Sequence, residues 1–467
     1  MKVLNNIILQ FNDILWTYIL IAMLLILGVY FSFRTKFVQF RYIKEMFRLL
    51  GDGFSSEKKK GNISSFQAFC ISTASRVGTG NLAGIAIAIS VGGPGAIFWM
   101  WLIALIGAAS SFIESTLAQI YKEKNADGSF RGGPAYYMEK GLNKRWMGVI
   151  FSILITIAFG LIFNSVQSNT ITLAFNDAFG VDRLIVGVIL TLITLFVIFG
   201  GVHRVAKVSE VIVPIMALTY IAVAVFILLI NITEVPSVIK LIFENAFGFK
   251  EIAGGTLGGA MLMGIKRGLF SNEAGMGSAP NAAATATVSH PVKQGLIQTL
   301  GVFTDTIIIC SCTAFIILLS GVDYTNNSIT GIQLTQKALS SQVGSWGNSF
   351  IAICILLFAF SSIVGNYYYG ESNIEFLTKK KSYVFIYRIF VVAMVFFGSI
   401  AEIQIVWNLA DVFMGLMAVV NLIAITLLSK QAFAALKDYS NQKMSGIKEP
   451  LFKASSIPEL KNVSEWN

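Results

Sequence analysis

The chain has 467 residues, of which 55% are hydrophobic and only 13% are charged. An ordinary soluble domain has about 25% charged residues, and a soluble chain of this length would need much more polar surface. The composition therefore predicts a polytopic membrane protein, and it excludes a soluble enzyme, a disordered scaffold and a nucleic-acid-binding protein. The net charge of +10 is expected to report topology, because basic residues gather on the cytoplasmic loops of membrane proteins.

Apolar runs long enough to cross a bilayer recur along the whole chain. We expect eleven spans, at about residues 14–33, 66–92, 94–119, 146–172, 183–200, 209–231, 253–288, 293–321, 346–372, 383–401 and 403–428. The first run follows Lys2 and Asp13 and precedes several basic residues. It is therefore expected to be a membrane anchor and not a cleaved signal peptide.

The distribution of Lys and Arg predicts an orientation. With the N-terminus outside, the basic residues fall mostly on the inner loops and on the tail after residue 430, while the outer side holds only Lys2, Arg183, Lys240, Lys250 and Lys337. This asymmetry fits the positive-inside rule. We expect residues 34–60 to form a basic amphipathic segment at the inner leaflet, and the tail to be a cytoplasmic helix followed by a loose end. The compartment indicated is a prokaryotic plasma membrane.

The run at 66–92 is unusual because its middle holds three glycines with Arg76 and Asn81. Small residues alone are typical of a helix-packing face, but such a face does not require an Arg or an Asn. A break at residues 78–80 would free backbone N–H groups at one half-helix end and carbonyl groups at the other. The N–H groups suit a carboxylate and the carbonyl groups suit Na⁺.

The run at 253–288 repeats this glycine-rich pattern. If the first helix is set aside, ten spans remain, and the two interrupted ones are the first and the sixth. Two inverted five-span halves with broken helices in matching positions indicate a transporter with a binding site near the membrane midplane. The expected division is an N-terminal helix and basic segment at 1–64, repeats at 65–231 and 232–429, and a cytoplasmic tail at 430–467.

Four motifs carry a family resemblance: residues 72–84 (STASRVGTGNLAG), 131–137 (RGGPAYY), 266–280 (KRGLFSNEAGMGSAP) and 361–371 (SSIVGNYYYGE). Together they resemble the alanine/glycine:cation symporter family, also called sodium:alanine symporters. The resemblance covers all eleven expected spans. It implies an all-α membrane protein of the LeuT fold, with two inverted five-helix repeats and one extra N-terminal helix. It also implies Na⁺-driven import of a small neutral amino acid by a transporter that is not an enzyme.

The resemblance assigns candidate site residues. Residues 77–81 are similar to the VGLGN motif of neurotransmitter:sodium symporters, which implies that the main-chain amides at Thr79 and Gly80, with Gly78 beside them, hold the substrate carboxylate. Asn81 matches a sodium ligand of that other family. The carbonyls of Ala74 and Val77 and the hydroxyls of Ser361 and Ser362 are implied to form a second sodium site; their oxygens suit a hard cation. Without the resemblance, the two serines would be expected to bond back to their own helix.

Other spans add candidates for substrate binding. Asn164 and Gln167 are three residues apart and share one face of an otherwise apolar helix. As interhelical contacts they would contribute only about 0.6–2 kcal/mol per bond, but the family motif implies that Gln167 holds the substrate carboxylate or amino group. From the sixth core span the resemblance adds Asn272 and Gly275.

Asn366 is a departure from the family pattern. Members commonly read GWxYYGE here, whereas this chain reads GNYYYGE at 365–371. Replacing Trp by Asn enlarges the pocket and adds an amide donor and acceptor, and a buried amide is costly unless it is paired. We therefore expect Asn366 to contact a substrate larger and more polar than alanine, with glutamine first and alanine or glycine next.

Charged residues also lie in or beside apolar runs, namely Arg76, Lys266, Arg267, Glu114, Glu273, Asp305, Glu371 and Asp411. Each is expensive at membrane depth unless paired or hydrated, so gates and struts are expected, with Asp305 the best candidate for an alternative ion site.

A proton-coupled transporter of the same fold, using Asp305 or Glu273, stays open as an alternative. An ion channel would need a charged ring or filter, and a membrane enzyme a cluster of catalytic groups. Na⁺, the amino acid and membrane lipids are the expected partners of a monomer.

Overall fold

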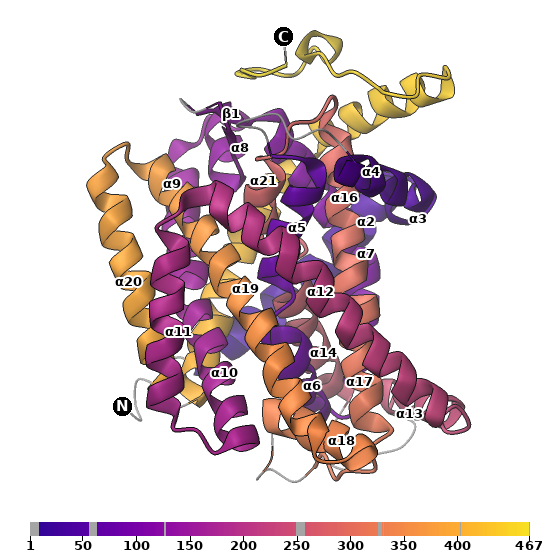
Figure 1. Cartoon of the computed structure of the whole chain (residues 1–467). Helices are drawn as coiled ribbons and strands as arrows, with labels where there is room; N and C mark the ends of the chain where they lie inside the picture. The colour runs from indigo at the N-terminus through magenta and orange to yellow at the C-terminus, as the bar shows by residue number, and fades with distance from the viewer. Residues whose placement is uncertain are drawn as a thin grey trace.

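The computed structural model describes residues 9–55, 63–125, 128–248, 257–325, 329, 331–401 and 403–466. Nearly all of this part of the chain is helical (Figure 1). Eight of its helices are long and apolar enough to cross a membrane, namely Leu9–Arg34, Ala96–Ile120, Arg145–Phe179, Arg204–Ile230, Pro291–Leu318, Trp346–Leu377, Lys381–Ile400 and Val406–Met444. Gly80–Gly92 and Arg183–Ile198 are shorter apolar helices. Each of the eleven expected runs therefore contains helix, but eleven as the number of spans stays a prediction.

The first part of the chain forms the following elements: η1 (Leu15–Leu20), α2 (Ile21–Arg34), α3 (Val38–Arg41), α4 (Ile43–Ser55), α5 (Ser65–Arg76), η2 (Gly80–Gly84), α6 (Ile85–Gly92), α7 (Ala96–Ile120), β1 (Glu123–Lys124), β2 (Phe130–Arg131), α8 (Pro134–Lys140), α9 (Arg145–Ile155), η3 (Thr156–Phe163), α10 (Asn164–Phe179), α11 (Arg183–Ile198) and α12 (Gly201–Ile230). β1 and β2 pair antiparallel. The segments η1, η2 and η3 are π-helical.

The second part forms α13 (Val235–Ala246), α14 (Leu257–Asn272), α15 (Ala279–Ala283), α16 (Pro291–Val302), η4 (Phe303–Cys310), α17 (Ser311–Leu318), α18 (Ile332–Val343), α19 (Trp346–Leu377), α20 (Lys381–Ile400), α21 (Ile403–Met444) and η5 (Ala454–Ser456). The expected division into repeats stays a prediction; the proposed boundary after residue 429 lies inside the continuous helix α21.

Helix ends follow local capping chemistry. α5 begins with a capping box, in which the Ser64 hydroxyl accepts from the Gln67 N–H and the Gln67 side chain accepts from the Ser64 N–H. α16 begins with Pro291 in its first turn, and His290 Nδ1 accepts from the Val292 N–H. These caps set where the half-helix α5 and the long helix that begins with α16 start.

Both interrupted runs are broken where the glycines predicted. α5 ends at Arg76, and η2 begins at Gly80. α14 ends at Asn272, and before α15 begins at Ala279 the backbone takes positive φ angles at Glu273 (57°), Gly275 (85°) and Gly277 (88°). Glycine adopts this region without strain, which explains why the second break is rich in it.

The segments expected at the inner side of the membrane lie at one end of the molecule. In Figure 1, α4, α8 and β1 lie at the upper end with the yellow tail, whereas α13 and α18 lie at the opposite end. The tail after α21 is not a loose end, and that expectation was wrong. Phe452, Ile457 and Trp466 are buried because they pack onto the helix ends beneath them.

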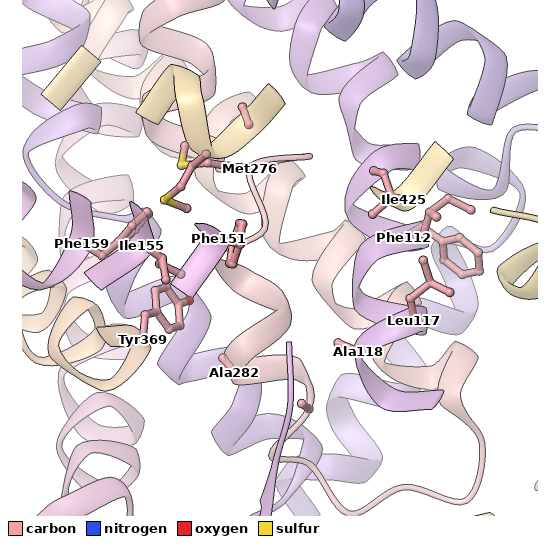
Figure 2. Packing of buried hydrophobic residues seen from close by; sticks show 14 of the residues in the cluster. Phe112, Leu117, Ala118, Phe151, Ile155, Phe159, Met276, Ala282, Tyr369 and Ile425 are labelled. Atoms are coloured by element: carbon pink, nitrogen blue, oxygen red, sulfur yellow. The ribbon is translucent and has the colours of Figure 1, made fainter. Parts of the chain in front are cut away.

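The hydrophobic core runs between the helices of both halves. Figure 2 shows part of it, where Phe151, Ile155 and Phe159 lie close to Tyr369 of α19. The Phe159 and Tyr369 rings are 5.5 Å apart in an edge arrangement, a geometry that aromatic pairs favour. This packing holds α19 against α9 and η3, and so fixes the frame around the two breaks.

Candidate functional site

At the break in the first core span, a backbone N–H group without a partner in its own helix donates to a side chain of α10. The Thr79 N–H donates to Gln167 Oε1 at 3.0 Å, and the Thr79 hydroxyl donates to the same oxygen at 2.5 Å. Both residues are buried. Gln167 Oε1 therefore occupies the kind of position that a carboxylate oxygen of a substrate would take at a half-helix N-terminus.

Gly78 lies too close to its neighbours to carry a side chain. A Cβ at this position would be 2.3 Å from Ser362 Oγ and 2.9 Å from Gln167 Oε1. The Gly78 N–H donates to Asn81 Oδ1 at 2.9 Å, which closes the break into a tight turn. Gly80 is equally confined, because its Cβ would be 2.9 Å from the Phe270 ring. The three expected residues 78–80 thus lie at the point where α5, α10, α14 and α19 meet.

The four residues implied for the second sodium site lie together. Ser362 Oγ is 2.9 Å from the Ala74 carbonyl oxygen and 3.3 Å from the Val77 carbonyl oxygen, and Ser361 Oγ is 3.5 Å from the Ala74 carbonyl oxygen. Both hydroxyls also bond back to the Phe358 carbonyl, as the simpler expectation had it. Two backbone carbonyls and two hydroxyls converging from two helices form a neutral, all-oxygen set of donors suited to Na⁺.

Asn81 is not oriented toward these four residues. Its amide group Nδ2 donates to Asp305 Oδ1 at 2.6 Å and to Ser271 Oγ at 3.0 Å. Ser271 Oγ donates in turn to Asp305 Oδ2 at 2.7 Å, and so does Thr306 Oγ1 at 2.7 Å. Asn81 therefore belongs to a separate buried network around the Asp305 carboxylate, which lies in the π-helical segment η4. Such segments are common at functional sites.

The second break is held open by a buried carboxylate of α7. Glu114 accepts from the Gly275 N–H and from the Gly277 N–H, each at 3.1 Å, and from Asn421 Nδ2 at 2.7 Å. The Gly275 carbonyl accepts from the same Asn421 amide at 2.9 Å. Both backbone polar groups of Gly275 therefore have partners, and the substrate contact that the resemblance implies for Gly275 stays a prediction.

Among the candidate substrate contacts, two buried amide groups have a polar atom without a partner among the described residues. Asn366 Oδ1 accepts from the Ser75 hydroxyl at 2.7 Å, but Asn366 Nδ2 has no partner. Asn272 Oδ1 accepts from the Ala274 N–H at 3.0 Å, and Asn272 Nδ2 has none. Buried donors are normally satisfied by protein, water or ligand. These two N–H₂ groups are therefore free to bind an acceptor on a ligand.

Sequence reasoning missed the contacts that join the two breaks. The Ser75 hydroxyl is also 3.0 Å from Glu273 Oε1, and the Ser278 hydroxyl donates to Glu273 Oε2 at 2.5 Å. The chain of contacts from Asn366 through Ser75 and Glu273 to Ser278 thus connects α19, α5 and the second break. Ser75 could be singled out from the sequence because it lies one residue before Arg76 within an apolar run. Its partners lie about two hundred or more residues away in the sequence, so no local pattern indicates them.

The buried charges fall into two groups, those in direct ion pairs and those around Arg76. Lys266 and Arg267 both pair with Asp411, at 2.7 and 2.8 Å, and Arg388 pairs with Glu371 at 2.7 Å. The ring of Trp407 lies 4.6 Å from the Arg267 guanidinium, and the rings of Phe270 and Trp407 are 4.8 Å apart. Phe270 and Trp407 lie beside the first break, because a Cβ at Gly80 would be 2.9 Å from the Phe270 ring and a Cβ at Gly84 would be 3.9 Å from the Trp407 ring.

Arg76 makes no direct ion pair with a described residue. Its guanidinium donates to the Gln298 carbonyl at 3.2 Å and to Ser111 Oγ at 3.4 Å. It interacts electrostatically with the buried carboxylates of Glu114, Glu273 and Asp305. One cation therefore faces three acids in the membrane interior, where unbalanced charge is costly. Added cations, either Na⁺ or protons, would balance them.

Comparison with known proteins decides the family. Residues 1–454 match the sodium:alanine symporter family. The chain belongs to this family. It is 60% identical over 465 residues to the protein named probable sodium/glutamine symporter GlnT of Bacillus subtilis (strain 168), a match that covers 100% of this chain and 96% of the relative.

Two further matches bear on the ion and the fold. The chain is 38% identical over 437 residues to a sodium/proton-dependent alanine carrier protein of Bacillus sp. (strain PS3), covering 90% of this chain and 97% of the carrier. It is similar to the structure of MhsT in complex with L-phenylalanine, with a TM-score of 0.56 at 15% identity, covering 84% of this chain and 99% of that chain. At that identity the likeness bears on the fold alone.

These matches confirm the resemblance and the LeuT-type helical fold that the sequence predicted. They also confirm a transporter and not an enzyme. Sodium-coupled amino-acid symport is therefore the class of function, and a multi-pass membrane protein is its form.

Proposed function

We propose that the chain imports a neutral amino acid, glutamine first, together with Na⁺, by alternating access. The observation that carries this proposal is the junction at residues 78–80. There the Thr79 N–H at the end of a broken helix is hydrogen-bonded to the Gln167 side chain. Ser362 Oγ lies beside the carbonyls of Ala74 and Val77, which together with Ser361 supply the four oxygen ligands proposed for Na⁺. The relative that is 60% identical is named probable sodium/glutamine symporter, which supports this substrate.

The substrate carboxylate replaces Gln167 Oε1 at the Thr79 N–H. Gln167 Oε1 serves as a placeholder for that carboxylate, because it already accepts from the Thr79 N–H and hydroxyl at the half-helix N-terminus. When a carboxylate arrives, the Gln167 side chain turns so that its N–H₂ donates to the ligand. The exchange costs little, since each buried donor keeps an acceptor throughout, and it favours ligands that carry a carboxylate.

Sodium couples to this step by joining two helices. Ala74 and Val77 lie on the last turn of α5 and beside the break, whereas Ser361 and Ser362 lie on α19. An ion bound by both helices stabilises the conformation in which residues 78–80 and Gln167 are assembled. A ligand that binds one conformation more tightly shifts the equilibrium toward it, so Na⁺ and substrate raise each other's affinity.

Glutamine is favoured by the unpaired amide donors. Asn366 Nδ2 and Asn272 Nδ2 are buried and have no partner among the described residues. The side-chain carbonyl of glutamine is an acceptor that an alanine side chain lacks. A site with buried donors rejects a ligand that leaves them unpaired, because each unpaired group costs about 1–3 kcal/mol.

Two variants at residue 366 separate pocket size from hydrogen bonding. Asn366→Trp fills the space, so we expect glutamine uptake to fall about tenfold or more while alanine uptake is retained. Asn366→Leu keeps the volume and removes the amide, so the KM for glutamine rises and that for alanine stays unchanged. Uptake of labelled glutamine and alanine by proteoliposomes measures both. If Asn366→Trp leaves glutamine uptake intact and alanine uptake unchanged, the pocket argument fails.

The gates of the pathway follow from the ion pairs. Lys266, Arg267 and Asp411, with Trp407 and Phe270, cover the break on the outer side in the orientation that the charge distribution predicts. The contacts of Ser75 with Glu273 cover it on the inner side. Alternate release of these two layers would expose the site to one side of the membrane at a time.

Proton coupling is the second candidate. It is favoured by the three buried carboxylates around a single Arg76, and by the words sodium/proton-dependent in the name of one relative. Asp305 is the residue best placed to carry a proton, because hydroxyl and amide donors contact it and no cation pairs with it among the described residues. Asp305→Asn would abolish uptake driven by a pH gradient if this candidate is right.

A further inference from the structure

The tail after α21 lies across the end of the molecule that the charge distribution assigns to the cytoplasm. Residues 445–466, here called the strap, contain only a single 3₁₀ turn, η5. Phe452, Ile457 and Trp466 of the strap are nonetheless 4–7% exposed. The burial of three large apolar side chains in a segment without regular structure requires a partner surface, and that surface is made of the ends of several helices.

The strap binds the loop between α15 and α16. The Phe452 N–H donates to the Ser289 carbonyl at 2.9 Å, and the Ser289 hydroxyl donates back to the Pro450 carbonyl at 2.9 Å. The Phe452 ring packs edge-on against His290 at 5.0 Å. Lys293 pairs with Glu449 of the strap, and Arg48 of α4 reaches the same carboxylate at 3.2 Å.

Trp466 fastens the other end of the strap to α7. Its ring nitrogen Nε1 donates to the Gln119 carbonyl at 2.8 Å, and its ring lies 4.7 Å from Lys122 Nζ and 5.4 Å from Phe452. The Gln119 and Lys122 side chains in turn each donate to the Ala286 carbonyl at 3.0 Å. The strap and α7 therefore both contact the loop that contains residue 286, each from a different side.

That loop also holds the first half-helix of the broken span. The Thr287 N–H donates to the Ile63 carbonyl at 3.0 Å, and Ile63 and Ala286 form a parallel bridge directly before α5 begins at Ser65. An unbroken series of contacts thus runs from the strap through residues 286–290 to the start of α5. For the site to open toward this side, α5 has to separate from that loop.

We propose that the strap is an intramolecular latch that holds the inner gate closed and must loosen in each transport cycle. The proposal rests on the alternating-access symport argued above, but on no particular substrate. The strap joins the ends of α4, α7 and α16 to the loop that holds α5, so that its attachment stabilises the closed gate. Its release removes those contacts without touching the residues at 78–80, Gln167 or the sodium-type donors.

The buried thiol of Cys70 provides a reporter for gate opening, because it lies on α5 and is fully buried. In a background of Cys310→Ser, Cys312→Ser and Cys354→Ser, the rate at which a membrane-permeant maleimide labels Cys70 measures how often α5 moves away. We expect Trp466→Ala to raise this rate about tenfold, since the lost aromatic burial and hydrogen bond exceed the free energy that such a change requires. Trp346→Ala, at an exposed residue of the opposite end, is the matched control.

A purely structural role would lower the melting temperature of Trp466→Ala and leave Cys70 labelling at the rate of the control, and that result would overturn the proposal. Labelling requires no substrate, so it can fail or succeed independently of the glutamine assignment. A second measurement avoids a destabilised variant. Ser289→Cys with Leu451→Cys, joined by a short cleavable dithiol-reactive linker, should lose uptake and regain it when the linker is reduced. Full uptake while crosslinked, with the single-cysteine variants as controls, would also contradict the latch.

Discussion

At the scale of single residues, the polar side chains left within apolar spans carry the transport chemistry. Ser362 is an example, because its hydroxyl contacts both carbonyls that α5 contributes, at 2.9 and 3.3 Å. Ser361, one residue earlier, reaches only the Ala74 carbonyl and at 3.5 Å, while it bonds more closely to its own helix. The two serines therefore should not contribute equally to a bound ion.

Ser362→Ala tests this difference. Removing one oxygen donor from the proposed sodium site should raise the Na⁺ concentration for half-maximal uptake by about tenfold, a loss of about 1.4 kcal/mol. Ser361→Ala should raise it much less. Both are measured by Na⁺ titration of amino-acid uptake at saturating substrate. Equal Na⁺ dependence of Ser362→Ala and the unmodified protein would remove Ser362 from the ion site.

The sequence could predict these residues but not their partners. Gly78, Thr79, Gln167 and the two serines were identified from composition at membrane depth and from the family motif, and the structure brings them to one junction. The resemblance implies a sodium ligand at Asn81, and that role stays a prediction; the sequence could not show that its amide bonds to Asp305 and Ser271. Which neighbours a polar side chain meets depends on helix packing across the two halves, and no local pattern encodes it.

At the scale of secondary-structure elements, the break at 77–79 separates two half-helices and presents both of their ends. Its geometry depends on the lack of a side chain at Gly78, where a Cβ would lie 2.3 Å from Ser362 Oγ. Gly84, a few residues later in η2, has room, since the nearest atom to its Cβ would be 3.8 Å away. The two glycines therefore serve different purposes in the same span.

Gly78→Ala and Gly84→Ala form a matched pair. Gly78→Ala should abolish uptake, because the methyl group displaces Ser362 or Gln167 from the junction, while the protein still elutes as a folded species. Gly84→Ala should transport normally and be slightly more stable, by about 0.5–1 kcal/mol, as expected for Gly to Ala within a helix. Uptake and thermal unfolding in detergent distinguish the two. Normal transport by Gly78→Ala would show that the break tolerates a side chain and would contradict the site.

The positions of both breaks could be predicted, because glycine clusters within apolar runs are a local signal. The second break shows a feature that could not be predicted, namely the contacts that shape its loop. Its loop is shaped by Glu114, which lies on α7 more than a hundred residues away in sequence and accepts from the backbone N–H groups of Gly275 and Gly277. Glu114 was visible in the sequence only as a charge within an apolar run. The tail after Met444 is expected to be loose because its composition is polar, but its apolar side chains Phe452, Ile457 and Trp466 are buried against the rest of the chain.

At the scale of the whole molecule, the basic residues that predict orientation also surround the strap. Lys122 is buried beneath it, with Phe130 and Trp466 over its ammonium, the Ala286 carbonyl as acceptor and Glu465 as the nearby charge. Burial lowers the pKa of Lys122 to about 7, an effect that Glu465 partly opposes. In a released strap, the lysine meets water and its pKa rises toward the ordinary value of about 10.4.

Strap attachment should therefore depend on pH. Above about pH 7, attachment releases a proton from Lys122, so raising the pH tightens the strap, by up to about tenfold per unit. Below that pH the lysine is protonated in both states and the dependence levels off. Hydrogen exchange of residues 445–466 at pH 6, 7 and 8, corrected for intrinsic rates, measures this. Lys122→Met should abolish the dependence; equal protection at every pH in the unmodified protein would contradict it.

The most direct test of the central claim is uptake of labelled glutamine into proteoliposomes that hold the purified full chain. With equal pH on both sides and an inward Na⁺ gradient, the account predicts saturable, concentrative glutamine uptake that exceeds alanine uptake and collapses when the gradient is removed. A pH gradient without Na⁺ should drive no accumulation. Accumulation driven by the pH gradient alone, or no response to Na⁺, would contradict sodium-coupled import through this site.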